Sequence, residues 1–366
     1  MIFCTRCNAP YPDQGVPYHC PECGGIFDYP SIVLPSENYD DKALPGIWRY
    51  RNTFGLPPHA PMISLGEGNT PLVWAETLGH PVAFKCEYQN PTGSFKDRGS
   101  ATLVSFLCSR GVVQAVEDSS GNAGASFAAY AARSGIKARV YVPETTSGPK
   151  LKQIETYGAE VITVPGQRSN AAEMVRQAAD SGEVYASHAY LPFSLPGYAT
   201  IAFEVVEQLG APPGTFICPA GQGGLILGAA RGFAALKAAQ VIHRYPKLIG
   251  VQARACAPLF KQHKLGILGW NETEEGSTLA EGVRVRFPLR SLEVVQAVRS
   301  SEGRFIAVAE ADILPGRDEL AHRGFYVETT SALVWDALAQ MISDFGTERM
   351  PEPVVVVLTG SGLKTA

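Results

Sequence analysis

The chain has 366 residues, a formal net charge of −4 and 45% hydrophobic residues, which is enough for two or three compact units with their own cores. It contains no basic run with interleaved aromatic residues, and no apolar stretch is long enough to cross a bilayer. The start, Met1 to Cys4, lacks the charged-then-apolar pattern of a signal peptide. We therefore expect a soluble, cytoplasmic protein that binds neither nucleic acid nor a membrane.

Half of the eight cysteines lie near the start of the chain, with the spacing C-x2-C-x12-C-x2-C: Cys4, Cys7, Cys20 and Cys23. Two Cys-x-x-Cys turns can present four sulfurs to one tetrahedral zinc ion. Two disulfides are an alternative that a cytoplasmic location disfavours, and a segment that keeps its cysteines without a metal is another. We interpret residues 1–30 as a structural zinc-ribbon-like segment. The other cysteines are expected to be small buried side chains: Cys86, Cys108, Cys218 and Cys256.

Short apolar segments alternate with helical patterns along the rest of the chain. Strands are predicted at 82–87, 115–118, 138–142, 160–164, 215–218, 248–251 and 354–358. Helices are predicted at 96–110, 124–134, 150–157 and 227–239. Apolar strands that are short enough to be buried on both faces, separated by helices, predict parallel α/β sheets.

A lysine lies just before the first of these helices, in the stretch Asn90 to Gly99, which reads N-P-T-G-S-F-K-D-R-G. Nearby backbone N–H groups, a helix N-terminus and partial desolvation all favour a neutral, nucleophilic amine at Lys96. A lone lysine would be interpreted as an ordinary surface residue. Three further segments make the functional interpretation the better one.

Each of these segments follows a predicted strand. Ser119 to Gly124 reads S-S-G-N-A-G, and its Asn122 is either a helix cap or a polar group that contacts a ligand. Pro219 to Leu225 is a glycine-rich turn before a helix, a setting that suits an anion, although it lacks the full G-x-G-x-x-G spacing. Thr359 to Lys364 reads T-G-S-G-L-K.

Together these segments resemble the pyridoxal-phosphate (PLP) enzymes of fold-type II, which include threonine synthases, serine/threonine dehydratases and cysteine synthases. The resemblance to threonine synthases covers nearly the whole chain, with matching stretches at residues 48–50, 64–72 and 324–332. It implies an α/β fold of two doubly wound sheet domains with an N-terminal zinc-ribbon-like segment. The implied domains are the ribbon at 1–30, a large PLP domain at 46–93 and 192–366, and a small PLP domain at 94–191. A homodimer is also expected from the resemblance.

The resemblance implies roles for individual residues. Lys96 would hold PLP and act as the catalytic base, and Asn122 would bind the phenolate oxygen of the cofactor. Thr359, with Ser361 as the second choice, would face the pyridine nitrogen. A hydroxyl there cannot hold the nitrogen protonated as a carboxylate would, which favours elimination and replacement over transamination. The cofactor phosphate would be bound by the glycine loop: Gly221, Gln222, Gly223 and Gly224.

The implied reaction is that of a lyase in amino-acid biosynthesis, which converts O-phospho-L-homoserine and water to L-threonine and phosphate. Substrate contacts are assigned to Ser119, Ser120, Ser187 and Ser194. The family loop N-S-x-N-P-x-R-x-E-G-x-K-T departs here, because Ser194, Pro196 and Ala199 stand at its Arg, Glu and Lys positions. Each charge-assisted bond lost with the arginine costs about 1.5–3 kcal/mol. His188 in this loop is interpreted as a bystander, since it binds phosphate only when it is protonated.

This departure leaves a second activity open. The alternative is a serine/threonine dehydratase or another β-replacement enzyme, similar to cysteate or cysteine synthase, acting on a different small amino-acid substrate. A catalytically silent PLP-binding protein is a third possibility. The presence of Lys96, Asn122 and Thr359 together argues against it.

Overall fold

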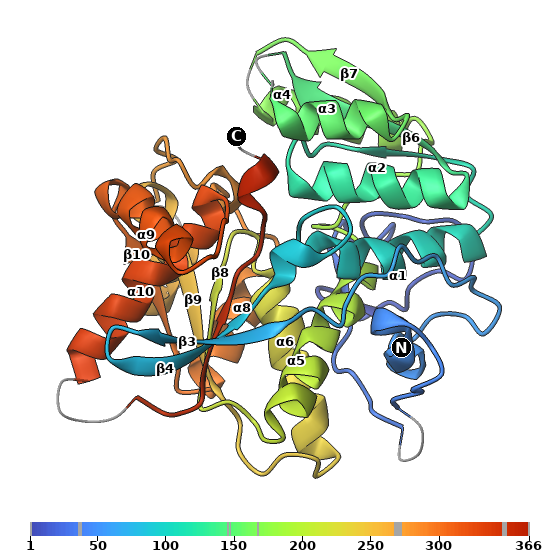
Figure 1. The fold of residues 1–366 in the computed structure, drawn as a ribbon. Helices are drawn as coiled ribbons and strands as arrows, with labels where there is room; N and C mark the ends of the chain where they lie inside the picture. Colours follow the sequence, from blue (N-terminus) through green and yellow to red (C-terminus); the bar gives the residue numbers. More distant parts are fainter. Residues whose placement is uncertain are drawn as a thin grey trace. The chain divides into compact units, whose positions relative to one another are not determined.

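The structure is a computed structural model, and it describes residues 2–35, 39–144, 146, 148–166, 168–266, 273–345 and 350–364 (Figure 1). The chain divides into two compact units. The first unit comprises Met1–Gly68 and Asn90–Gly197, and the second comprises Asn69–Gln89 and Tyr198–Lys364. Helix α5 (Leu195–Leu209) begins in the first unit and continues into the second.

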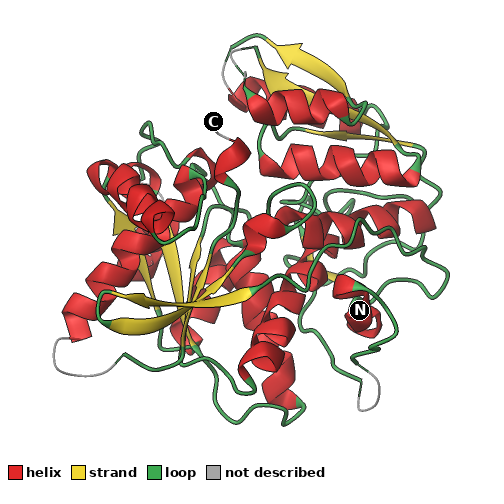
Figure 2. Ribbon diagram, viewed as in Figure 1, coloured by secondary structure: helices red, strands yellow, loops and turns green. Residues whose placement is uncertain are grey.

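Both kinds of secondary structure occur in the first unit (Figure 2). Its strands are β1 (Phe3–Cys4), β2 (Phe27–Asp28), β5 (Gln114–Glu117), β6 (Lys137–Pro143) and β7 (Glu160–Val164). Its α-helices are α1 (Lys96–Ser109), α2 (Asn122–Ser134), α3 (Pro149–Thr156) and α4 (Arg168–Asp180). Two 3-10 helices, η1 (Gly46–Thr53) and η3 (Pro192–Ser194), complete the described elements.

A three-stranded parallel sheet in the order β5-β6-β7 organises the first unit. Helix α4 packs on one face of this sheet through Ala171 and Val175, which contact Val116 and Tyr141. A parallel bridge between Val116 and Tyr185 extends the sheet beyond β5. Because the pairing is parallel, the segment after Tyr185 leaves the sheet at the same edge as the segment after β5.

Residues 2–28 form the cysteine segment, which pairs β1 with β2 in an antiparallel ladder. Its small core consists of Cys4, Cys20 and Phe27, with Tyr11 packed against them. The segment belongs to the first unit together with α1 and the three-stranded sheet.

The second unit also alternates strands and helices. Its strands are β3 (Leu72–Thr77), β4 (His80–Lys85), β8 (Thr215–Pro219), β9 (Lys247–Ala253), β10 (Arg304–Val308) and β11 (Val354–Val357). Its α-helices are α6 (Gly224–Ala238), α7 (Pro258–Leu265), α8 (Ser291–Ser300), α9 (Glu310–His322) and α10 (Thr329–Phe345). Its 3-10 helices are η2 (Glu87–Gln89), η4 (Arg254–Cys256), η6 (Glu281–Val283) and η7 (Gly362–Lys364).

These strands form one six-stranded sheet in the order β10-β9-β8-β11-β4-β3. All neighbours are parallel except β3, which pairs antiparallel with β4 and lies at the edge. The expectation of purely parallel sheets is therefore wrong for this edge. The β3–β4 connection is a tight turn at Leu78 and Gly79, and such a turn can join only antiparallel neighbours. Strands β8 and β11 are buried throughout, as continuous apolar strands should be.

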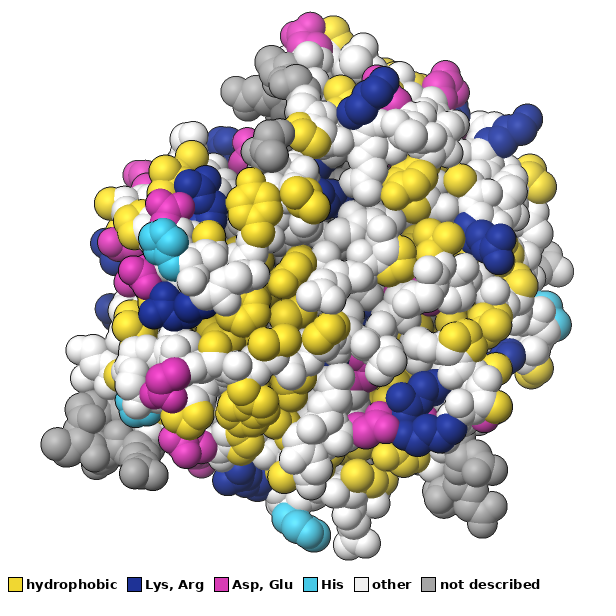
Figure 3. Space-filling view, viewed as in Figure 1, with side chains coloured by type: hydrophobic (Ala, Val, Ile, Leu, Met, Phe, Trp, Pro, Cys, Tyr) yellow, Lys and Arg dark blue, Asp and Glu magenta, His cyan; other side chains and the backbone are white. Residues whose placement is uncertain are grey.

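The strands and helices predicted from the sequence all occur, shifted by a few residues at most. Cys86, Cys218 and Cys256 are buried as expected, whereas Cys108 is wrongly predicted, because it lies near the end of α1 and is only half-buried. The expected domain boundaries differ from the two compact units at residues 46–68, 90–93 and 192–197, which group with the first unit, and they stay a prediction. Among the described helices, none combines the length and apolarity that a membrane span needs. On the face drawn in Figure 3, lysine and arginine side chains are scattered among acidic and hydrophobic ones.

Candidate active site

Lys96 is the first residue of helix α1 in the first unit. Its side chain is half-buried, and its Nζ lies 5.0 Å from the centroid of the Phe95 ring. The helix N-terminus carries a partial positive charge, which opposes the ammonium form of an amine placed there. The structure therefore places Lys96 in the setting that the sequence indicated.

The residue after the lysine anchors this turn. The Asp97 carboxylate is fully buried and accepts hydrogen bonds from the Thr92 backbone N–H at 2.7 Å and the Thr92 hydroxyl at 2.6 Å. It also accepts a bond from the Ser126 hydroxyl at 2.6 Å. Because Ser126 belongs to α2, Asp97 joins the lysine-bearing turn to the helix that carries Asn122.

Asn122 begins helix α2, two residues earlier than the sequence predicted. The N-cap residue of this helix is Gly121, so the alternative in which Asn122 serves only as the cap is not the arrangement found. Gly124 explains how closely the helix approaches the preceding loop, because a Cβ at Gly124 would lie 1.7 Å from the Ser119 carbonyl oxygen. Only glycine allows this approach, which holds Ser119 against the first turn of α2.

The buried carboxylate of Glu117 organises the loop between β5 and α2. It accepts a hydrogen bond from the Ser119 backbone N–H and lies 3.0 Å from Nδ1 of His188. His188 thus pairs with an acid at the end of β5 rather than standing alone as a bystander.

The predicted substrate serines differ in their surroundings. Ser119, Ser120 and Ser187 lie at the same edge of the three-stranded sheet, because the segment after Tyr185 runs parallel to β5. The Ser187 hydroxyl accepts bonds from the N–H groups of Ala189 at 3.3 Å and Tyr190 at 3.4 Å, so it shapes its own turn. Ser194 ends η3 and is buried, and its hydroxyl has no hydrogen-bond partner among the described residues.

The glycine-rich turn occupies the corresponding position in the second unit, between β8 and α6. Gly223 is the N-cap of α6 with φ +81°, a conformation that favours glycine, and no side chain caps the helix. The first N–H groups of this 15-residue helix have no acceptor within the helix itself. The side-chain oxygen of Gln222 accepts the Leu289 N–H at 3.2 Å, so Gln222 can offer its backbone N–H rather than this oxygen to an anion.

Thr359 follows β11, the sheet neighbour of β8, so Thr359 and the glycine turn lie at the same edge of the six-stranded sheet. Its hydroxyl lies 2.8 Å from the Ser331 hydroxyl, and both side chains are buried. The Ser331 oxygen also accepts the Gly360 N–H at 2.8 Å, and Gly360 O is a longer alternative acceptor at 3.3 Å. When Ser331 donates its proton along the shorter contact, Thr359 retains its own proton for a further partner.

A second lysine, Lys85, illustrates a purely structural role. It is fully buried in β4, and its Nζ donates to Glu204 at 2.8 Å, Thr70 O at 2.8 Å and Gln208 at 2.9 Å. All three protons of the ammonium group are satisfied, so Lys85 stabilises the second unit as a charged group.

The four cysteines of the N-terminal segment lie together, with their sulfur atoms all within 4.8 Å of one another. Cys4 Sγ is 3.5 Å from Cys23 Sγ, and Cys7 Sγ is 3.6 Å from Cys20 Sγ. Sulfurs bound tetrahedrally to one zinc ion lie about 3.8 Å apart, whereas a disulfide needs about 2.0 Å. Burial raises the pKa of Cys4, but hydrogen bonds from the N–H groups of Cys7 and Arg6 outweigh it and lower that pKa to about 7. At Cys7 the hydrogen bond from Ala9 lowers the pKa, but the neighbouring thiols and burial outweigh it and raise that pKa to about 12.

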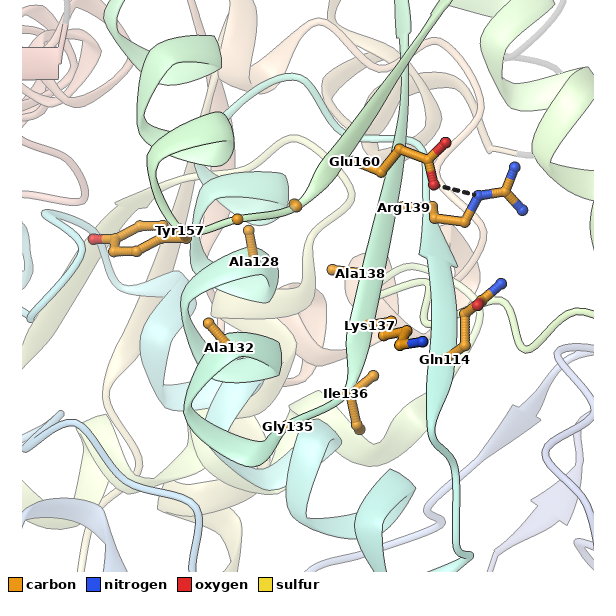
Figure 4. A pocket seen from close by; sticks show the side chains of 12 residues that line it. Gln114, Ala128, Ala132, Gly135, Ile136, Lys137, Ala138, Arg139, Tyr157 and Glu160 are labelled. Atoms are coloured by element: carbon orange, nitrogen blue, oxygen red, sulfur yellow. Dashed lines mark ion pairs between the residues drawn. The ribbon is translucent and has the colours of Figure 1, made fainter.

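A cavity of about 350 Å³ lies at the opposite edge of the first unit's sheet, where the three strands begin (Figure 4). Gln114, Lys137 and Glu160 line it together with the C-terminal half of α2, and Arg139 pairs with Glu160 at 3.2 Å. None of the predicted site residues lines this cavity. It is separate from the edge that carries Ser119 and Asn122.

Sequence reasoning did not single out Asp97, Glu117 or Ser331. Asp97 stands in the lysine motif itself, and an acid in the first turn of a helix was a usable signal. Ser331 stands in the stretch 324–332, which the sequence indicated only as a match to threonine synthases. Its contact with Thr359 spans 28 residues, a pairing that no local pattern reveals.

Comparisons with known proteins agree with this geometry. A family model described as "Pyridoxal-phosphate dependent enzyme" matches residues 63–360. Threonine synthase from Methanocaldococcus jannaschii is 35% identical over 99% of this chain and 92% of its own length. Threonine synthase from Mycobacterium leprae is 34% identical over 86% of this chain and 87% of its own. Maize serine racemase shares the fold, with a TM-score of 0.69 at 21% identity over 80% of this chain and 88% of that one.

The chain belongs to the pyridoxal-phosphate dependent enzyme family and has its α/β fold-type II architecture. It is a threonine synthase-like, PLP-dependent lyase. The chemistry of both units suits the cofactor. The first unit offers a helix-terminal lysine and an amide at a strand end. The second offers a helix N-terminus whose N-cap is a glycine and a buried hydroxyl, that of Thr359, at a strand end.

Proposed function

We propose that this protein converts O-phospho-L-homoserine and water to L-threonine and phosphate. The observation that carries the proposal is the extent of the match to threonine synthases. The chain aligns with the Methanocaldococcus jannaschii threonine synthase over 99% of its length, so the cysteine segment, the lysine turn and the final T-G-S-G-L-K motif all fall within the match.

In the first unit, Lys96 would hold the cofactor and move a proton at the substrate Cα. Asn122 would hydrogen-bond the phenolate oxygen of the cofactor. Asp97, through its bond to Ser126, would hold Lys96 and Asn122 in fixed relative positions. Ser119 and Ser120 would contact the substrate at the same strand end. The neutral amine that this role needs is favoured by the N-terminus of α1.

In the second unit, the backbone N–H groups of Gly221, Gln222, Gly223 and Gly224 would bind the phosphate of the cofactor. Thr359 would donate a hydrogen bond to the pyridine nitrogen, because Ser331 leaves its proton available. Pyridoxal phosphate, when bound, supplies an electron sink for negative charge at the substrate Cα. A hydroxyl partner keeps the ring nitrogen unprotonated, which suits elimination followed by addition of water.

A second candidate is supported by the loop that carries Ser187 and Ser194. Ser194 and Ala199 replace an arginine and a lysine of the family pattern. Both side chains are uncharged and buried. The neighbouring His188 has its Nδ1 3.0 Å from the Glu117 carboxylate, so this nitrogen already has a partner. This loop suits an uncharged leaving group, as in a serine/threonine dehydratase or another β-replacement enzyme.

The deciding experiment measures phosphate release and threonine formation from O-phospho-L-homoserine, with deamination of L-serine and L-threonine assayed in parallel. Threonine with one equivalent of phosphate supports the first candidate. Ketoacid without phosphate supports a serine/threonine dehydratase. No turnover of any of the three substrates contradicts both of these activities and leaves a β-replacement enzyme with another leaving group.

The lysine assignment has its own test. Lys96→Ala should abolish the visible absorbance band of the bound cofactor, whereas Lys152→Ala, an exposed lysine of α3, should retain it. Persistence of the band in the Lys96 variant would contradict the assignment.

We also propose that Cys4, Cys7, Cys20 and Cys23 bind one structural zinc ion and that residues 1–30 form a zinc ribbon. Elemental analysis should find about one zinc per chain. A metal-free protein that folds normally would contradict this. Because all four ligands come from the protein, the ion would take no part in catalysis.

Two further proposals rest on the resemblance to threonine synthases: the large domain at 46–93 and 192–366 with the small domain at 94–191, and a homodimer. A cytoplasmic location is proposed from the composition and charge of the chain. Light scattering of the purified protein tests the homodimer, and a mass of one chain would contradict it. Limited proteolysis tests the boundaries, since cleavage should fall at residues 31–45 and near residues 93–94 and 191–192 rather than within the proposed domains.

A further inference from the structure

Two tyrosines of the cysteine segment contact the loop that carries two of the candidate substrate serines. We call residues 185–194 the substrate loop. Tyr11 contacts its C-terminal end and Tyr18 contacts its N-terminal half. Both partners belong to the first unit, so the contacts lie within one compact body.

Tyr11 connects the core of the cysteine segment to Phe193. Its ring lies 4.7 Å from Phe27, which packs with Cys4 and Cys20, and 5.1 Å from Phe193, in edge-to-face geometry in both cases. Phe193 in turn stacks on Phe106 of α1, with ring centroids 3.4 Å apart and an interplanar angle of 12°. The aromatic chain therefore runs without interruption from the cysteine cluster to the residue before Ser194.

Tyr18 makes the second connection. Its ring lies 5.4 Å from Tyr185 and 5.2 Å from Tyr190, both in edge-to-face geometry. Its hydroxyl donates to the Asp180 carboxylate at 3.0 Å, which ties the tyrosine to the end of α4. Tyr185 and Tyr190 lie on either side of Ser187.

The serines depend on these aromatic residues for their position. Ser187 accepts the Tyr190 N–H, so a shift of Tyr190 would move the hydroxyl. Ser194 directly follows Phe193, whose carbonyl accepts a 2.7 Å hydrogen bond from the Thr102 hydroxyl of α1. Neither tyrosine needs to touch substrate to affect where the serines lie.

We propose that Tyr11 and Tyr18 are positioning residues, through which the cysteine segment fixes the substrate loop. The loop-fixing half of the inference stands on the contacts alone. The effect on substrate binding rests on the proposed function, which assigns Ser187 and Ser194 to the substrate.

Hydrogen–deuterium exchange on the PLP-loaded protein tests the first half. Tyr18→Ala removes both ring contacts and should speed amide exchange in residues 185–194 by about tenfold, with β6 and β7 unchanged. Tyr18→Phe keeps the rings and loses only the bond to Asp180, so its loop exchange should stay near that of the parent. Tyr157→Ala is the matched truncation control, because Tyr157 lies beside the cavity at the opposite edge of the sheet. Unchanged loop exchange in Tyr18→Ala would overturn the proposal.

Tyr11→Ala extends the test to the other end of the loop, and Tyr18 remains informative if that variant fails to fold.

Steady-state kinetics test the second half of the proposal, the effect on substrate binding. For Tyr18→Ala, KM for the amino-acid substrate should rise about tenfold with kcat within about twofold and the cofactor band unchanged, because the lysine turn is held separately by Asp97. Faster loop exchange with unchanged KM would overturn the substrate role of the loop and leave the loop-fixing role standing. Equal losses of kcat in Tyr18→Ala and Tyr157→Ala would indicate general destabilisation and overturn the positioning role.

Discussion

Replacing Ser331 by alanine should remove a hydrogen-bond partner of the Thr359 hydroxyl without opening a cavity. The substitution removes one buried oxygen that accepts the Gly360 N–H at 2.8 Å and contacts Thr359 Oγ1 at 2.8 Å. A buried donor left without an acceptor costs about 1–3 kcal/mol, so the unfolding free energy should fall by that amount. Thr359 loses the donor that kept its own proton available, so its bond to the cofactor should weaken by about 1 kcal/mol, or about fivefold in cofactor affinity.

A double-mutant cycle separates these two effects. Cofactor affinity and the visible spectrum are measured for the parent, Ser331→Ala, Thr359→Val and the double variant, with urea unfolding as the stability measurement. Thr359→Val keeps the shape of the side chain and removes the hydroxyl. Ser331→Ala should weaken cofactor binding about fivefold in the parent and less than about twofold in the valine background.

Two results would refute this reasoning in different ways. Equal effects of Ser331→Ala in both backgrounds would show that Ser331 acts on stability alone. An unchanged cofactor spectrum and affinity in Thr359→Val would instead remove Thr359 from the cofactor site, and Ser361 would become the candidate. Thr359→Ser keeps a hydroxyl and is the control variant. It should match the parent in cofactor affinity if Thr359 binds the cofactor, whether or not Ser331 contributes to that binding.

Three other predictions follow from single features. Gly124→Ala should destabilise the protein by about 1–3 kcal/mol or prevent folding, because the new Cβ meets the Ser119 carbonyl; urea unfolding checks this, and parent-like stability would contradict it. Burial raises the pKa of Asp40, but Arg49 and Lys42 outweigh it and lower that pKa below 3.8. Its contribution is therefore present above pH 3.8 and lost as the pH falls through the folded-state value, a loss that acid unfolding of Asp40→Asn should not show. Removing metal from the four-cysteine cluster with a chelator should lower the thermal transition, and an unshifted transition would mean that no structural ion was bound.

The sequence was a good guide to the fold wherever local patterns decide it. Buried strands such as β8 and β11 read as continuous apolar runs, and helices such as α1 begin at a recognisable turn. Strand β3 was not predicted, because its exposure pattern does not alternate and Val73 and Trp74 remain exposed on an edge. Its antiparallel pairing depends on the turn at Leu78 and Gly79, which the search for strand–helix alternation passed over.

In the candidate site, too, local sequence patterns indicate some residues and miss others. Lys96, Asn122 and the glycine turn carry local signals, and the structure places each at a strand end or a helix N-terminus. The supporting contacts are non-local: Asp97 reaches Ser126 across 29 residues, and Glu117 reaches His188 across 71. Such pairings are set by tertiary packing, which no window of sequence contains.

Within the first unit, helix α1 connects Lys96, the candidate cofactor-binding lysine, to the substrate loop. Lys96 begins the helix, and two residues further on the Gly197 backbone approaches the helix so closely that a Cβ would lie 2.0 Å from the Arg98 carbonyl oxygen. Thr102 then binds the carbonyl of Phe193, and Phe106 stacks on its ring. A helix of 14 residues is stiff over this length, so the amine and the loop share one support. Tyr11 of the cysteine segment packs against Phe106 and Phe193, so the cysteine segment is joined to the same helix. An N-terminal segment without catalytic groups can therefore influence substrate binding through packing alone.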